Sequence, residues 1–198
     1  MINSLDINKY TELYQDFLHP NPNINYQAFL ILRKEFEVTF INNLLANLNV
    51  EDIYIRRKSI LALGRFGEKI LKLIVPLYID TNSTTVKVSC LKTILKVVVN
   101  FKLEELTKDE MLVVDLALKD GAAEIILTVI SILRQLGTTG RNILMKTCRD
   151  KDLLKAKASI SALLEMKDHA VDDLLDELLN DESIDPMIKE DILRDKII

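Results

Sequence analysis

The chain has 198 residues, of which 48% are hydrophobic and 28% are charged, and its net charge is −4 at pH 7. Five glycines and four prolines are few for a fold with many β-turns. The mild negative charge argues against a nucleic-acid binder that works by neutralising phosphates. No basic segment leads into an apolar signal region and no apolar run is long enough to span a bilayer, so we expect a cytoplasmic protein without membrane insertion.

The first fifty residues predict three short helices. An apolar and aromatic side at residues 7–18 predicts a helix, and we expect residues 1–18 to cap the N-terminal end of the fold. Two prolines and two asparagines at residues 19–23 predict a break. Apolar residues at three- and four-residue steps predict further helices at 24–32 and 36–48.

Residues 51–79 predict a helical hairpin. Ile53, Ile60 and Leu63 share one face of its first segment, and apolar residues recur with the same helical period in its second segment. Gly64 follows the first segment, where a helix C-cap favours a residue with positive φ. Such a hairpin cannot bury both of its apolar faces alone, so we expect other hairpins on either side of it.

The remaining sequence repeats this arrangement. Helices are predicted at 86–99, 109–118, 124–136, 140–148, 152–165 and 170–179, with a C-terminal capping helix at 186–198. Thr107 and Glu110 have the spacing of a capping box. Gly137 is expected to end one helix in the way that Gly64 ends another. The β-branched run Val97–Val99 is poor for an isolated helix, so we expect it to be buried on several sides.

Equivalent positions indicate an internal repeat. Large residues near the ends of the first helices of the hairpins are Leu32, Leu63, Ile94, Leu136 and Leu163. The first three follow one another at equal intervals, whereas the third interval is longer and the fourth is shorter. Small residues stand four positions earlier, at Ala28, Ser59 and Cys90, where two helices must approach closely. A period of about 30 to 40 residues built from helix pairs is typical of α-solenoids.

The sequence therefore predicts an all-α fold. We expect a right-handed α-solenoid of about five HEAT-like helical hairpins with terminal capping helices, forming one domain over residues 1–198. A closed helical bundle is the alternative, and the repeating registers disfavour it.

The sequence carries no motif typical of an enzyme. It lacks GxGxxG, a phosphate-binding loop, GxSxG and HExxH. His19 and His169 stand in polar turns without a metal-ligating partner on the same helix face, and we expect both to be solvated. Cys90 is expected to be a buried packing residue and Cys148 to be partly exposed, while a reactive thiol stays an alternative for each. The two cysteines have no metal-type or redox-type neighbour, which favours a reducing compartment. We therefore predict no catalytic residue, no metal site and no intrinsic cofactor.

The charges are unevenly distributed. Basic residues crowd residues 51–96, at Arg56, Arg57, Lys58, Arg65, Lys69, Lys72, Lys87, Lys92 and Lys96. The C-terminal segment is strongly acidic and includes a predicted solvated ridge at Asp172, Asp173, Asp176 and Glu177. The simplest interpretation is a solvated surface. The functional interpretation is a polarised surface that orients a partner, holds the carboxylates of a ligand, or promotes head-to-tail association into a homodimer.

Several segments resemble the HEAT-repeat proteins of phycobilisome biogenesis, the CpcE/CpcF and CpeY/CpeZ group. Residues 52–64, DIYIRRKSILALG, resemble the repeat core of that family. The stretch TVKVSCLK at 85–92, continuing to VVVN at 97–100, is similar to the next repeat of the CpeZ type. NDES at 180–183, followed by IKE at 188–190, resembles the CpeZ-type C-terminal cap. The likeness spans most of residues 18–198, although the fourth and fifth repeats lack the paired arginines and Leu164 replaces the usual glycine.

The resemblance implies a role in the covalent attachment of an open-chain tetrapyrrole to cysteines of phycobiliprotein subunits. Members of the group are bilin lyases, often heterodimeric, or chaperones that support a lyase and the folding of phycoerythrin subunits. The implied partners are phycoerythrin subunits and a CpeY-type lyase, and the implied ligand is a transient phycobilin such as phycoerythrobilin. The implied compartment is the cyanobacterial cytoplasm, or the plastid stroma of an alga.

Three functions stay open from the sequence. They are a chaperone-like accessory factor for phycoerythrin maturation, a bilin lyase subunit itself, and a generic HEAT-repeat scaffold. The candidate residues for binding a partner or a bilin are Arg56, Arg57, Arg65 and Lys87.

Overall fold

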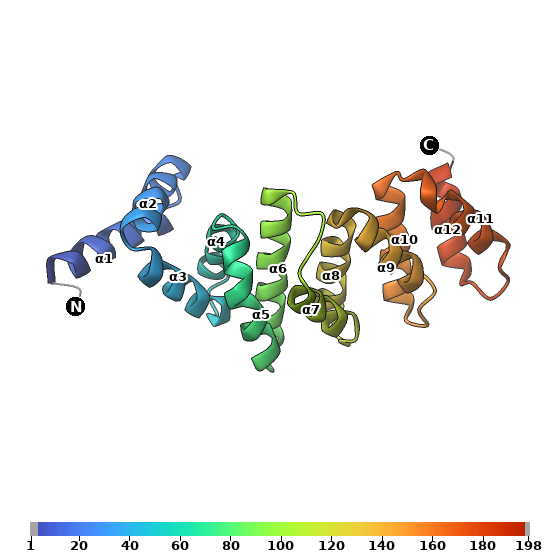
Figure 1. Ribbon diagram of the computed structural model, residues 1–198, viewed down its shortest axis with the longest axis horizontal. Helices are drawn as coiled ribbons and strands as arrows, with labels where there is room; N and C mark the ends of the chain where they lie inside the picture. The colour runs from blue at the N-terminus through green and yellow to red at the C-terminus, as the bar shows by residue number, and fades with distance from the viewer. Residues whose placement is uncertain (1–3, 197–198) are drawn as a thin grey trace.

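The computed structural model describes residues 4–196, which form an elongated, gently curved row of α-helices (Figure 1). The described residues contain no β-strand, so the all-α prediction is confirmed. The predicted capping helices 1–18 and 186–198 correspond to α1 (Ser4–Leu18) and α12 (Pro186–Lys196). Residues 1–3 and 197–198 lie outside the described residues.

Between α1 and α12, the helices follow one another in pairs. The first helices of the pairs are α2 (Pro22–Glu35), α4 (Ile53–Leu63), α6 (Thr84–Phe101), α8 (Ala123–Gln135) and α10 (Leu153–Met166). The second helices are α3 (Glu37–Ala46), α5 (Leu71–Asp80), α7 (Lys108–Leu118), α9 (Gly137–Thr147) and α11 (Asp172–Asn180). Short 3-10 turns at Asn47–Asn49, Glu68–Ile70 and His169–Val171 join some of them.

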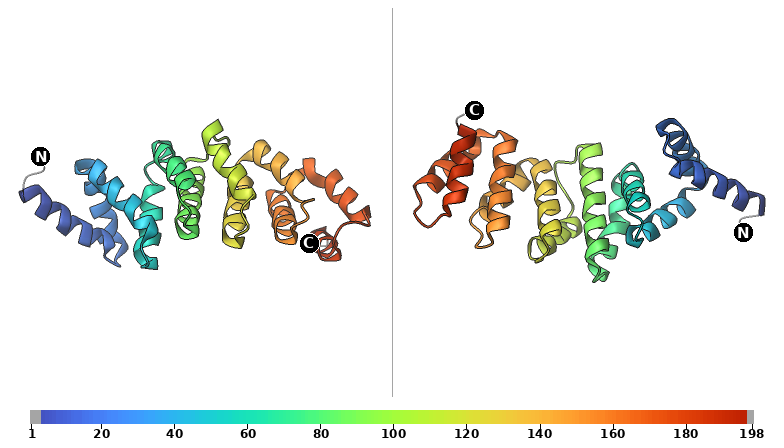
Figure 2. Two further views of the ribbon diagram at one scale, coloured as in Figure 1. Left: turned by 90° about the horizontal axis from the view of Figure 1, so that it is seen from below. Right: turned by 180° about the vertical axis from the view of Figure 1, so that it is seen from behind.

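Each helix packs mainly against helices that are close to it in the sequence. Helix α6 contacts α4, α5 and α8, and α10 contacts α8, α9 and α12. Helices α1 and α12 lie at opposite ends of the row in both views of Figure 2. This arrangement is consistent with an α-solenoid, in which a unit contacts only its neighbours.

The N-caps of the first helices recur along the chain. These caps are Asn21, Asp52, Ser83, Ala122 and Asp152. All but Ala122 accept a hydrogen bond from a backbone N–H of the first turn, which is the usual role of Asn, Asp and Ser at this position. The intervals between them are nearly equal, except that the one from Ser83 to Ala122 is longer because of the length of α6 and the connector at 102–107.

The predicted capping box at the end of that connector is confirmed. The Thr107 hydroxyl accepts from the backbone N–H of Glu110, and the Glu110 carboxylate accepts from the backbone N–H of Thr107. The start of α7 is therefore defined by two residues that are close in the sequence.

Counting positions from the N-caps corrects one of the residues that were predicted to be equivalent in the repeats. Fully buried residues stand eleven positions after each N-cap, at Leu32, Leu63, Ile94, Leu133 and Leu163. Leu133 therefore takes the place predicted for Leu136, which is the C-cap of α8. The small residues four positions before the first three of these are also buried, as predicted: Ala28, Ser59 and Cys90.

The apolar positions of the predicted helix faces are not all buried. Ile53 is exposed at the first position of α4, before the part of the helix that its neighbours cover. In the β-branched run of α6, Val97 and Val98 are buried as predicted, whereas Val99 is exposed. The core thus surrounds much of α6, and its last turn reaches the surface at Val99.

Gly64 has a different role from the predicted one. Its φ is −59°, an ordinary helical value, and the chain turns instead at Gly67, whose φ is +81°. A Cβ atom at Gly64 would lie 2.4 Å from the Cβ of Lys96. The Gly64 carbonyl also accepts a hydrogen bond of 2.9 Å from Asn100 Nδ2 of α6. Glycine is therefore required by the close approach of α4 and α6. At Gly137 the predicted positive φ is confirmed, at +48°.

An aromatic cluster holds α1 against the first helix pair. The rings of Tyr10 and Phe36 are 5.5 Å apart, and those of Phe17 and Phe40 are 5.1 Å apart, both edge to face. The Tyr10 hydroxyl accepts a hydrogen bond of 2.7 Å from Asn43 Nδ2. Burial raises the pKa of Tyr10 to about 12, so the phenol stays neutral. The aromatic side predicted for this helix therefore faces the fold.

Ion pairs join neighbouring helix pairs along the row. Their partners stand roughly one repeat apart in the sequence: Glu37–Lys69, Lys87–Asp120, Lys92–Glu124, Arg134–Glu165, Arg141–Asp168, Arg149–Asp181 and Lys157–Asp191. Exposed pairs of this kind contribute about 0 to 1 kcal/mol each, so they orient neighbours more than they stabilise them.

The close approach at Gly64 predicts a specific sensitivity to added volume. We expect Gly64→Ala to lower the free energy of unfolding by about 1 to 3 kcal/mol, because the new methyl group must displace Lys96. Gly121→Ala is the matched control, since nothing lies within 4 Å of a Cβ at that position. Urea unfolding followed by circular dichroism measures both. Equal stability of the two variants would contradict the assigned role of Gly64.

Candidate functional site

The four predicted binding residues lie along α4, the turn after it and α6, but the structure does not bring all four together. Arg56 and Arg57 line a groove between α4 and α6. Arg65 and Lys87 are outside that groove and face other helices. The predicted set therefore divides into a pair that shares a groove and two residues that join helices.

We call this feature the α4–α6 groove, and its volume is about 240 Å³. Its lining residues are Ile53, Arg56, Arg57, Ile60, Thr85, Val88, Ser89, Lys92 and Glu124. Apolar side chains at Ile60 and Val88 form its buried part, and cationic side chains stand at its edges.

Lys92 is a groove residue that was not among the predicted candidates. From the sequence it counted only as one member of the basic cluster. Lys92 stands nine positions after the N-cap Ser83, on the helix next to the one that carries Arg57. Counting positions from the N-caps in the sequence would therefore have identified it as a candidate.

The two arginines of the groove are in different states. Arg56 donates from Nη1 to the carbonyl oxygen of Val50, which ties the guanidinium to the turn before α4. Arg57 is exposed and makes no ion pair, hydrogen bond or ring contact with any residue that the structure describes. Across the groove, Lys92 pairs with Glu124 at 2.7 Å. Arg57 is therefore the cation of the groove that is free to bind a carboxylate.

Arg65 packs against aromatic rings of the preceding pair. Its guanidinium carbon lies 5.4 Å from the ring centroid of Tyr26 and 5.3 Å from that of Phe29. Such cation–π contacts stabilise by about 0.5 to 1 kcal/mol at exposed sites. Arg65 therefore joins α4 to α2 as well as contributing positive charge to the surface.

Lys87 forms the least exposed ion pair between neighbouring helix pairs among the described residues. Its Nζ lies 3.1 Å from Oδ2 of Asp120, and the two side chains are 26% and 21% exposed. The same Nζ lies 5.9 Å from the ring centroid of Tyr78. The pKa of Asp120 is lowered below its usual value, first by the hydrogen bond from the backbone N–H of Ala122 and second by the hydrogen bond and positive charge of Lys87. Lys87 is thus engaged within the fold.

The cysteines are both buried. The structure confirms this for Cys90 and corrects the expected partial exposure of Cys148. Burial raises the pKa of the Cys90 thiol to about 12 and also raises that of Cys148. The thiolate is the nucleophilic form of cysteine, so burial and the raised pKa disfavour reaction at both side chains.

The histidines and the acidic ridge are solvated, as predicted. The Nδ1 atom of His19 accepts a hydrogen bond from the backbone N–H of Asn21. His169 is almost fully exposed, and its Nδ1 lies 3.0 Å from Oδ2 of Asp172, a neighbour that was not predicted. Within residues 4–196, no group of histidine, cysteine and carboxylate side chains is placed to hold a metal ion. No helix described by the structure is both long enough and apolar enough to span a membrane.

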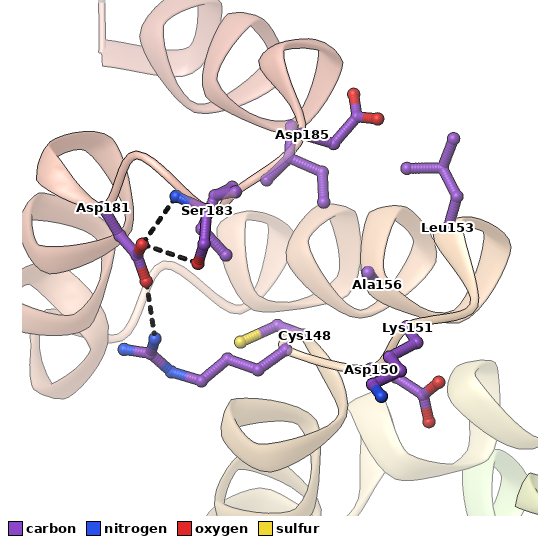
Figure 3. Close-up of a pocket in the computed structure, with 11 residues that line it drawn as sticks. Cys148, Asp150, Lys151, Leu153, Ala156, Asp181, Ser183 and Asp185 are labelled. Atoms are coloured by element: carbon purple, nitrogen blue, oxygen red, sulfur yellow. Dashed lines mark hydrogen bonds and ion pairs between the residues drawn. The ribbon is translucent and has the colours of Figure 1, made fainter.

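A second cavity, of about 410 Å³, lies between the turns that precede α10 and α12 (Figure 3). Its carboxylates are already engaged. Arg149 reaches Oδ2 of Asp181 at 3.5 Å, and Asp181 accepts hydrogen bonds from the backbone and the hydroxyl of Ser183. Asp185 caps α12 by accepting from the backbone of Met187. We therefore interpret this cavity as part of the contact between helix pairs and do not propose it as a ligand site.

The different states of Lys87 and Arg57 predict different effects of charge reversal. We expect Lys87→Glu to lower the free energy of unfolding by about 1 to 2 kcal/mol, because it places a second carboxylate beside the half-buried Asp120. Arg57→Glu should change it by less than about 0.5 kcal/mol. Urea unfolding of the two variants checks this. If Lys87→Glu is as stable as Arg57→Glu, the proposed engagement of Lys87 is wrong.

The lowered pKa of Asp120 predicts a pH dependence. A carboxyl group with a depressed pKa in the folded state contributes stability above its ordinary pKa of 3.8 and loses it as the pH falls through the folded-state pKa. We therefore expect Asp120→Asn to be less stable than the unmodified chain at pH 7, with a difference that shrinks below about pH 4. Urea midpoints measured from pH 7 to pH 3 test this, and a difference that stays constant would contradict it.

Comparison with known proteins places the chain beside two cyanobacterial proteins, although no family model matches it. It is 24% identical over 178 residues to phycocyanin operon protein Z of Pseudanabaena tenuis, covering 89% of this chain and 88% of that protein. It is 28% identical over 153 residues to the bilin biosynthesis protein CpeZ of a Synechococcus strain, covering 74% of this chain and 82% of that protein. These matches confirm the predicted resemblance to proteins of the CpeZ type, which extends over most of the chain.

Proposed function

We propose that the chain is a non-catalytic accessory protein of phycobilin attachment, which binds phycobiliprotein subunits and supports a bilin lyase. The observation that carries this proposal is the likeness to CpeZ, a bilin biosynthesis protein, over 74% of the chain. The finer proposal is a chaperone-like role in phycoerythrin maturation. Its partners would be phycoerythrin subunits and a CpeY-type lyase, and its transient ligand a phycobilin such as phycoerythrobilin.

The chemistry of the described residues supports an accessory role. Attachment of a bilin forms a thioether with a cysteine of the client subunit, so the helper does not need a nucleophile of its own. The two thiols of this chain are buried and have raised pKa values. The task left to the chain is therefore to bind and orient other molecules.

The size of the α4–α6 groove supports contact with part of a ligand rather than enclosure of a whole one. Its volume of about 240 Å³ is below the range of about 300 to 1,000 Å³ typical of pockets that enclose drug-sized ligands. A carboxylate arm of an open-chain tetrapyrrole, or an acidic side chain of a client, would fit beside Arg57, whereas Lys92 already pairs with Glu124. Among the four sequence candidates, Arg57 is therefore the one that we propose as a direct contact.

The architecture that we propose for this role is the right-handed α-solenoid of about five HEAT-like hairpins with terminal capping helices. Its support is the near-regular spacing of the N-caps and the packing of each helix against its neighbours in the sequence. Such a stack offers a long surface to one partner, since its helices repeat side by side.

Co-expression tests the proposed function. A phycoerythrin subunit, a CpeY-type lyase and a bilin supply would be expressed with and without this chain, and the bilin-carrying soluble subunit measured by absorbance. We expect the yield to rise when the chain is present. An unchanged yield and spectrum would contradict the proposal. Bilin attachment by this chain without the lyase would instead make it a lyase itself.

The burial of the thiols predicts that they are dispensable for this effect. We expect Cys90→Ala and Cys148→Ala to raise the yield of coloured subunit as the unmodified chain does, because both thiols are buried. Circular dichroism controls for folding of each variant. A folded cysteine variant that no longer raises the yield would show that its thiol takes part in transfer.

A further inference from the structure

One face of the helices α2, α4 and α6 carries cations and apolar side chains, and none of its own residues is a carboxylate. Glu124 of α8 lines the α4–α6 groove beside it and pairs with Lys92. Residues five, nine and thirteen positions after each N-cap lie on the side of the helix opposite the buried residues at position eleven, because the helical turn places them there. In α6 the first of them, Val88, is nevertheless buried, in the α4–α6 groove. None of these positions in the three helices is Asp or Glu. We call this face the basic ridge. The residues of the ridge that matter below are Tyr26, Leu30, Arg57, Leu61, Arg65 and Lys92.

The apolar members of the basic ridge are exposed. Tyr26 is 46% exposed and Leu61 is 47% exposed, and Leu30 is also accessible. Their equivalents further along the chain are different, because position nine holds Ser131 in α8 and Ser161 in α10. Position five of α8 does hold an exposed apolar residue, Leu127, but no cation stands at the three positions of that helix. Because Val88 of α6 is buried, the combination of exposed apolar groups and cations belongs to α2 and α4.

The ridge is continuous from α2 to α6. Arg65 lies over the ring of Tyr26, which links α4 to α2. Arg57 and Lys92 line the same groove, which links α4 to α6. Helices α4 and α6 also approach closely where Gly64 meets α6. The side chains thus form one surface across three neighbouring helices rather than isolated exposed residues.

The composition of this surface indicates the chemistry of its partner. Tyrosine and arginine are enriched among the residues that dominate protein interfaces, and exposed leucines supply apolar area between them. An amphipathic helix binds such a surface through apolar residues spaced three and four apart. The exposed guanidinium groups of Arg57 and Arg65 favour a helix whose flanking residues are Asp or Glu, since they would repel a basic one.

We propose that the basic ridge docks an acidic amphipathic α-helix of a partner protein. Leucine-like side chains of that helix would cover Leu30, Leu61 and Tyr26. Its carboxylates would pair with Arg57 and Arg65, since Lys92 already pairs with Glu124. This proposal rests on the proposed function, which supplies a protein partner. It adds the surface that contacts the partner and the chemistry of the partner's helix.

A binding measurement with defined peptides tests the proposal on the full chain. The probe is a fluorescein-labelled helical peptide of about 20 residues, with leucine at helical spacing and glutamate on its flanks. The matched peptide has lysine in place of each glutamate. Fluorescence anisotropy should show the glutamate peptide binding at least about tenfold more tightly than the lysine peptide, with an advantage that shrinks as salt is added.

Two variants locate the binding to the ridge. We expect Arg57→Glu and Leu61→Gln each to weaken binding of the glutamate peptide by about fivefold or more, with unfolding midpoints near that of the unmodified chain. Lys72→Glu is the matched control, because Lys72 is an exposed lysine on the second helix α5, and it should leave the affinity unchanged.

Three results would overturn the proposal. They are equal binding of the two peptides, an unchanged affinity in both ridge variants, and self-association of the chain that Arg57→Glu abolishes in sedimentation. The last result would make the acidic end of a second copy the occupant. The assay contains neither bilin nor phycobiliprotein, so its failure is distinguishable from failure of the co-expression test.

Discussion

The burial of one side of each first helix against the next pair is the interaction on which the rest of the structure depends. Leu63 and Ile94 are each completely buried, and neither could be buried within its own hairpin alone. The close contact of Gly64 with Lys96 and the bond from Asn100 to the Gly64 carbonyl fix how far α4 can move against α6. Since each pair is completed by its neighbours, the fold extends as a row and leaves a long surface accessible.

The same contacts decide which charges remain for a partner. Many of the basic side chains in residues 51–96 are engaged within the fold: Lys69 with Glu37, Lys87 with Asp120 and Lys92 with Glu124. Arg57 has no such partner among the described residues. The charge asymmetry of the sequence is therefore in part a consequence of ion pairs between consecutive helix pairs. Fewer basic side chains are available to a partner than the number in the sequence suggests.

Local features were predictable from the sequence, because they depend on residues close to one another. Helical periodicity located the helices, and the Thr107–Glu110 capping box was confirmed. Features that depend on contacts between pairs were not predictable in this way. The need for glycine at position 64 arises from Lys96 in the next helix pair, and the burial of Cys148 depends on packing against later helices. The same holds for the four binding candidates. Whether a candidate is free or engaged depends on residues far away in the sequence, as Asp120 is for Lys87.

The proposed role requires a surface on the first helices to bind a protein partner in bilin attachment. Hydrogen–deuterium exchange of the full chain, with and without an apo phycoerythrin subunit, tests this requirement most directly. We predict slower exchange in peptides that cover α2, α4 and α6, and no change in α11. Protection confined to α11 and α12, or no protection at all, would contradict it.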